Sequence, residues 1–99
     1  MKRDDHLLVI LAEEASEIIK DSTKALRFGI DDCHPVTKET NRDRLVCELN
    51  DFIAMIEMLQ TEGMLPLDVF DRVKIQAKKE KVERYLRYSQ ELGRLNETV

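Results

Sequence analysis

Four acidic residues of this chain stand in two pairs of equal spacing, Glu14 with Glu17 and Glu48 with Asp51. In each pair the members are three residues apart. Because residues three apart lie on the same face of an α-helix, each pair presents two carboxylates side by side. Two helices packed through these faces would gather four carboxylates.

Both pairs lie within apolar helical stripes, at a rotation of about 100° per residue. Glu14 lies within roughly 60° of the centre of the first stripe and Glu17 on its margin. Glu48 lies deep in the second stripe and Asp51 beside it. The stripes consist of Leu7, Leu11, Ala15 and Ile18, and of Leu45, Leu49, Phe52, Ile56 and Leu59. Buried carboxylates are costly and repel one another, so a cation is expected between them.

The kind of donor atom indicates which cation this is. Several carboxylate oxygens, with no His or Cys at matching spacing, are typical of a site for Mg²⁺, or Mn²⁺ as the alternative, rather than zinc or copper. Acids on amphipathic helices are more often solvated or paired with Lys and Arg, so a single pair would be weak evidence. Two pairs on the inner margins of neighbouring helices favour a metal site.

The two acidic motifs carry a family resemblance. Residues 13–17, EEASE, match the EExxE motif, and residues 48–51, ELND, the ExxD motif, of the all-α nucleoside triphosphate pyrophosphohydrolases, the MazG-like superfamily. The stretches LAEEASEIIKDSTKALRFGIDD, NRDRLVCELNDFIAMIEML and KVERYLRYSQELG resemble small single-domain members over nearly the whole chain. Thirty residues separate Glu17 from Glu48, which is long for the family, so the intervening loop is the least transferable part.

The resemblance implies an enzyme that cleaves a nucleoside triphosphate to the monophosphate and pyrophosphate, with Mg²⁺ as cofactor and a role in nucleotide-pool housekeeping. By position in the motifs, the metal ligands and catalytic residues would be Glu14, Glu17, Glu48 and Asp51. Glu13 belongs to the motif but points outward. A metal-activated water would attack, with Glu17 a candidate to accept its proton. The resemblance, and not the residues themselves, selects the bond between the α and β phosphates.

A triphosphate beside four carboxylates needs positive side chains as well as metal ions. Lys24 is the best placed in the first helix, because it follows Glu17 by seven residues and shares nearly the same face. Lys81 and Arg84 are the candidates in the third helix; for all three the alternative is a solvated surface charge. Base selectivity would depend on residues 30–40, and the substrate could be a dNTP, a damaged nucleotide or phosphoribosyl-ATP.

The helix-capping and helix-terminating residues of the chain predict an all-α fold in three helical blocks. The first runs from about Asp5 to Arg27, ended by Gly29; the second begins after a cap at Thr40 or Asn41 and ends before Gly63; the third begins at Leu65-Pro66. We expect a single MazG-like domain over residues 1–99. Three helices suggest an incomplete bundle finished by a homodimer or a dimer of dimers, with Met55, Met58 and Leu59 near the contact.

Composition and charge narrow the possible partners and the expected location of the protein. The net charge of −4 and the absence of a dominant basic face argue against a nucleic-acid partner. No signal peptide or apolar stretch of membrane-spanning length is evident, so a cytoplasmic protein is expected. Cys33 and Cys47 lack a CxxC spacing and are expected as free thiols. The alternative function is a helical dimerisation or adaptor module whose inner acids pair with Lys and Arg.

Overall fold

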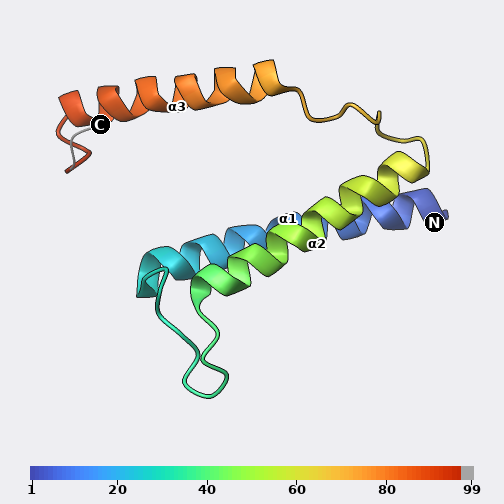
Figure 1. Ribbon diagram of the computed structural model, residues 1–99, viewed down its shortest axis with the longest axis horizontal. Helices are drawn as coiled ribbons and strands as arrows, with labels where there is room; N and C mark the ends of the chain where they lie inside the picture. The colour runs from blue at the N-terminus through green and yellow to red at the C-terminus, as the bar shows by residue number, and fades with distance from the viewer. Residues whose placement is uncertain (97–99) are drawn as a thin grey trace. The chain divides into compact units, whose positions relative to one another are not determined.

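A computed structural model describes residues 1–96, which form three α-helices and no strand apart from one isolated bridge. These are α1 (Arg3–Phe28), α2 (Asn41–Thr61) and α3 (Arg72–Glu91), shown in Figure 1. The predicted all-α class is confirmed. The chain divides into two compact units, Met1–Leu67 with α1 and α2, and Asp68–Val99 with α3. Each unit is described by itself.

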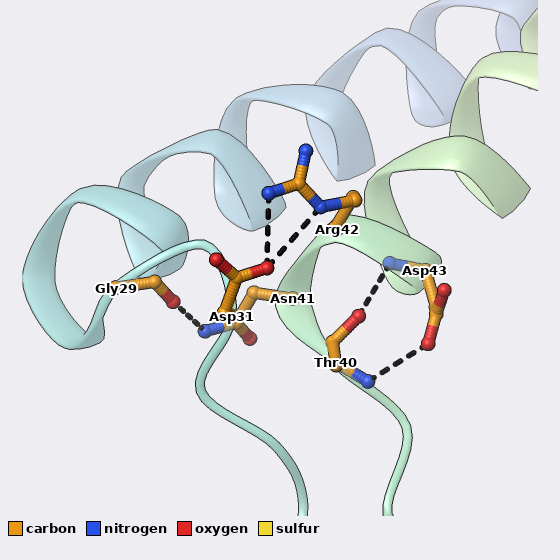
Figure 2. Close-up of polar contacts among 6 residues, drawn as sticks. All are labelled: Gly29, Asp31, Thr40, Asn41, Arg42 and Asp43. Atoms are coloured by element: carbon orange, nitrogen blue, oxygen red, sulfur yellow. Dashed lines mark hydrogen bonds and ion pairs between the residues drawn. The ribbon is translucent and has the colours of Figure 1, made fainter.

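Local capping interactions set the boundary between α1 and α2. Gly29 follows α1 with a φ of 99°, a conformation that a residue with a side chain rarely adopts. At the start of α2 the backbone N–H of Asp43 donates to the Thr40 hydroxyl at 3.0 Å, and the backbone N–H of Thr40 donates to the Asp43 carboxylate at 3.1 Å (Figure 2). These reciprocal bonds are a capping box. The predicted glycine stop and Thr40 cap are confirmed.

Side chains at the base of the loop hold its two ends together. The guanidinium of Arg42 pairs with the Asp31 carboxylate at 2.9 Å, and the Asn41 side-chain amide donates to the carbonyl of Gly29 at 2.8 Å (Figure 2). The loop therefore reverses the chain, and α1 and α2 run side by side in opposite directions (Figure 1). The C-terminal half of α1 thus faces the N-terminal half of α2.

The apolar core lies at the other end of this helix pair. Leu7, Met55 and Leu59 form its buried cluster, and Leu59 has no exposed surface. Leu11, Met64 and Leu65 pack around it. The prediction was wrong for Leu49, which is 45% exposed. At 100° per residue Leu49 lies about 80° from Leu59, whereas Glu48 lies only about 20° from it.

The third helical block begins later than predicted. Residues 64–70 are irregular, and α3 begins at Arg72 rather than near Leu65-Pro66. The Asp71 carboxylate caps it by accepting from the backbone N–H groups of Val73 at 2.9 Å and Lys74 at 3.2 Å. None of the residues of α3 is buried. Among the described residues, no helix has both the length and the apolar character that crossing a membrane requires.

Candidate metal centre

Three carboxylates meet where α1 and α2 face each other. One oxygen each from Glu14, Glu48 and Asp51 lies within 4.8 Å of the other two. Glu48 is buried at 8% exposure, Glu14 is half-buried and Asp51 is exposed. The group therefore extends from the interface of the two helices to solvent, as a site that binds an ion and a soluble ligand requires.

Glu17 lies outside this close group. It follows Glu14 by three residues on α1 and is half-buried. Its direction differs from that of Glu14 by about 60°. The structure thus brings together three of the four acids that the motifs single out, and the role of Glu17 as a metal ligand stays a prediction.

A fourth acid near the cluster, Asp21, was not anticipated from the sequence. It is only 3% exposed, and its Oδ2 atom has no hydrogen-bond partner among residues 1–96. The signal that could have found it is the spacing of seven residues from Glu14, which leaves the two side chains within about 20° on α1. Asp21 falls outside both acidic motifs.

The mutual repulsion of these acids shows at Glu48. Its pKa is raised first by burial and then by the negative charges of Asp21, Asp51 and Glu14. The guanidinium of Arg44 acts in the opposite sense, from 3.5 Å between its Nη2 and Glu48 Oε1. Burial and the three adjacent acids together outweigh this effect, so the pKa of Glu48 remains raised.

A cavity of about 460 Å³ lies at the end of the helix pair where the loop joins α1 to α2. Its lining includes Lys24 and Phe28 from α1, His34 from the loop, and Asn41 and Arg44 from α2. Lys24 was predicted to bind phosphate, whereas Arg44 was not singled out. Since Arg44 also contacts Glu48, its side chain connects the cavity with the acidic cluster.

His34 has a structural role in the loop between α1 and α2. Nδ1 of His34 accepts from the backbone N–H groups of Val36 at 3.2 Å and Thr37 at 3.3 Å, so this nitrogen stabilises a turn. Cys33 and Cys47 are both exposed and free, as predicted.

The other two predicted phosphate-binding residues lie on α3, in the second unit. The ammonium of Lys81 lies 5.9 Å from the centroid of the Tyr85 ring, a cation–π contact. Arg84 lines a shallow pocket with Lys81, Tyr85 and Tyr88. Contact of Lys81 or Arg84 with phosphate stays a prediction.

No protein family, no curated protein and no solved structure matches this chain. The features of this chain that bear on function are its acidic motifs, the positions of their side chains and the neighbouring cavity.

Proposed function

We propose that this protein is a Mg²⁺-dependent nucleoside triphosphate pyrophosphohydrolase of the MazG-like superfamily, which converts a (d)NTP and water to the (d)NMP and pyrophosphate. One observation carries the proposal: the two motifs, far apart in sequence, bring Glu14, Glu48 and Asp51 within 4.8 Å of one another across two antiparallel helices. Carboxylates this close repel one another, so a cation bound between them would stabilise the arrangement.

The residues of the cluster suit a hard divalent cation. All three are carboxylates, and the cluster contains neither His nor Cys. Glu48 is buried beside other acids, and Oδ2 of Asp21 has no hydrogen-bond partner within residues 1–96, so a cation would be favourable here. Glu14, Glu48 and Asp51 would hold the ion, Mg²⁺ or alternatively Mn²⁺. When bound, such an ion lowers the pKa of a water molecule and neutralises phosphate charge.

The chain itself would contribute proton transfer and phosphate binding. Glu17 is half-buried and follows Glu14 by three residues on α1, and its carboxylate would accept a proton from the attacking water. Lys24 and Arg44 line the cavity and can contact the phosphates. The cavity volume falls within the range of roughly 300–1,000 Å³ that is usual for small-molecule sites. The base would then lie against the loop, where side chains could select among nucleotides.

We propose assembly as a homodimer or a dimer of dimers, because α2 carries large apolar side chains that its own helix pair with α1 leaves exposed. On α2 these are Val46, Leu49, Ile53 and Met58. Among the three residues predicted near the contact, Met58 is 40% exposed while Met55 and Leu59 are buried within the helix pair. Met58 is therefore the one that can contact a second copy directly.

Pyrophosphate release from a panel of dNTPs, NTPs, damaged nucleotides and phosphoribosyl-ATP, with Mg²⁺ or EDTA, tests the proposal. Glu48→Gln should abolish release, whereas Glu57→Gln, an exposed position on the same helix, should not change it. A preference for phosphoribosyl-ATP over dNTPs would identify a phosphoribosyl-ATP pyrophosphohydrolase instead.

The second candidate is a helical adaptor, favoured by the Arg44–Glu48 ion pair and by the exposed apolar side chains. An adaptor would show no hydrolysis of any nucleotide and no change in melting temperature with Mg²⁺ or Mn²⁺.

A further inference from the structure

The loop between α1 and α2 is an ordered hairpin rather than an irregular connection. Cys33 pairs with Thr40 in an isolated antiparallel bridge, and the backbone N–H of Asn41 donates to the carbonyl of Asp32 at 3.0 Å. Side chains two residues apart on an extended segment lie on the same side of it. Asp32 and His34 are therefore presented together, and both line the cavity of about 460 Å³.

The loop itself fixes which nitrogen of His34 carries the proton. Nδ1 accepts from the backbone N–H groups of Val36 at 3.2 Å and Thr37 at 3.3 Å, so this nitrogen is unprotonated. In a neutral imidazole the other nitrogen, Nε2, then holds the proton. His34 can therefore offer a ligand in the cavity one N–H donor that is set before the ligand binds.

Asp32 offers the complementary function, a pair of acceptor oxygens. Its carboxylate takes part in none of the four ion pairs in the described part of the chain. Two neighbouring acids are engaged, because Asp31 pairs with Arg42 at 2.9 Å and Glu39 with Arg44 at 4.0 Å. An ionised carboxylate can only accept hydrogen bonds. The cavity thus presents a carboxylate and an N–H donor from the same side of one short segment.

Phe28 supplies an aromatic surface in the same cavity. Its side chain is 57% exposed, and the guanidinium of Arg27 lies over the ring at 4.8 Å from the centroid. This cation–π contact covers one face, so the other face can stack on a planar ligand. Lys24, about one helical turn before Phe28, and Arg44 add positive charge to the lining. A flat, hydrogen-bonding ring that carries phosphates suits these side chains.

We propose that this cavity binds the base of the nucleotide and selects guanine. Guanine carries the O6 acceptor, the N1–H donor and the 2-amino donor side by side on one edge. The Nε2–H group of His34 would donate to O6, and the two oxygens of Asp32 would accept from N1–H and the 2-amino group. Phe28 would stack on the ring. This inference rests on the proposed function and deepens it by naming the base.

The other bases lack two adjacent donors for the carboxylate of Asp32. Thymine and uracil have a single N–H with a carbonyl on each side, so one carbonyl would face a carboxylate oxygen. Cytosine and adenine offer an amino group next to a ring nitrogen that accepts. A site that hydrogen-bonds a polar group of its substrate rejects analogues without that group, because its own polar atoms are then left unpaired.

Pyrophosphate release from dGTP and from deoxyinosine triphosphate, which lacks only the 2-amino group, tests the assignment. Wild type should show a kcat/KM for dGTP at least about tenfold higher, which is the lower end for a hydrogen bond to a charged group. We expect the lower end because Asp32 is exposed in the absence of a ligand. Wild type should also prefer dGTP to dATP, dCTP and dTTP.

A change of preference in Asp32→Asn is the sharper test. The amide replaces one acceptor oxygen by an N–H donor, which matches xanthine, where a carbonyl stands in place of the 2-amino group. The kcat/KM of this variant should be higher for deoxyxanthosine triphosphate than for dGTP, the reverse of wild type. Asp68→Asn, the same chemical change at an exposed position of the second unit, should keep the wild-type order.

The role of His34 is tested separately by His34→Asn, whose side-chain oxygen can still accept from the backbone N–H of Val36. Guanine and hypoxanthine both carry O6. This variant should therefore lose kcat/KM for dGTP and deoxyinosine triphosphate by the same factor, with their ratio unchanged.

Three results would overturn the inference and leave the proposed function standing. They are an equal kcat/KM for dGTP and deoxyinosine triphosphate in wild type, a wild-type preference for a base other than guanine, and an Asp32→Asn enzyme that keeps the wild-type order. The first two need no variant, so an Asp32→Asn protein that fails to fold does not remove the test. Release of pyrophosphate from no nucleotide at all would defeat the proposed function and this inference with it.

Discussion

Replacement of Glu48 by Gln separates the metal-site hypothesis from the adaptor alternative. The substitution keeps the shape of a side chain that is 8% exposed and removes its negative charge. Without metal, the variant should melt at the same or a higher temperature than wild type, because repulsion from Asp21, Asp51 and Glu14 is relieved. With Mg²⁺ the order should reverse, because an ion stabilises the folded state that binds it in proportion to affinity.

The size of the Mg²⁺ effect follows from linkage. At an Mg²⁺ concentration 100 times the dissociation constant, binding adds about 2.7 kcal/mol to the stability of wild type. For a domain of this size that corresponds to roughly 11–22 °C in melting temperature. Glu48 is one of the three carboxylates that converge, so its loss should weaken binding by at least about 100-fold, the upper end for indirect contacts. The variant at the same Mg²⁺ concentration should then gain only roughly 2–3 °C.

Differential scanning calorimetry in EDTA and in a Mg²⁺ series measures both effects, at fixed protein concentration so that association does not contribute. Glu57→Gln is the matched control, with the same chemical change at an exposed position of α2. Equal gains in melting temperature from Mg²⁺ in Glu48→Gln and wild type would refute the role of Glu48 as a metal ligand. A variant much less stable than wild type in EDTA would show that Glu48 mainly neutralises Arg44, as the adaptor hypothesis requires.

The remaining predictions concern pH, the core, phosphate binding and assembly. The pKa of Glu48 is raised in the folded protein by burial and adjacent acids. The stability that Glu48 contributes in EDTA should therefore be lost as the pH rises from about 4.5, the ordinary pKa of a Glu side chain, through the raised pKa. Urea unfolding measures this loss, which should be absent in Glu48→Gln. Asp43, whose pKa is lowered by the hydrogen bonds with Thr40, should have the opposite effect, confined to pH values near and below its ordinary 3.8. Leu59→Ala should destabilise the fold by about 3–5 kcal/mol in urea unfolding, because Leu59 is fully buried, and Met58→Ala much less; equal losses would contradict the assigned core. Phosphate binding is tested by three substitutions, Lys24→Ala, Lys81→Ala and Arg84→Ala. Where the side chain binds phosphate, its loss should raise KM or lower kcat and leave metal affinity nearly unchanged. An equal loss of metal affinity in calorimetric titration would assign a structural role. Light scattering should find a dimer or tetramer at micromolar concentration, and a stable monomer would exclude the proposed assembly.

Local signals in the sequence were enough for the first two helices and for the proximity of three acids between them. Gly29 and Thr40 act through their own backbone and side chain, so the boundaries they set could be predicted. Glu48 was correctly placed in the buried stripe. Leu49 was wrongly placed in the same stripe, because hydrophobicity alone does not show how narrow the contact between two helices is.

The misses involve information that hydrophobic patterning does not contain. The apolar run after Leu65 continues into α3, so periodicity alone did not show that the helix begins only after the Asp71 cap. Asp21 was overlooked because it lies outside the acidic motifs, although its spacing from Glu14 marks it as an inward residue. Its relation to Glu48 depends on the register between α1 and α2, which only the folded pair shows.

The apolar cluster occupies one end of the helix pair and the buried acids occupy the other, so the two ends differ in local stability. Without an ion, the end with Asp21 and Glu48 has little apolar contact to resist opening, and its backbone amides should exchange with solvent deuterium faster than those around Leu7 and Leu59. A bound ion would link the two helices at this weaker end. Binding of the ion would then order the acidic end and the cavity beside it, so the site would take its final form only when the ion is bound.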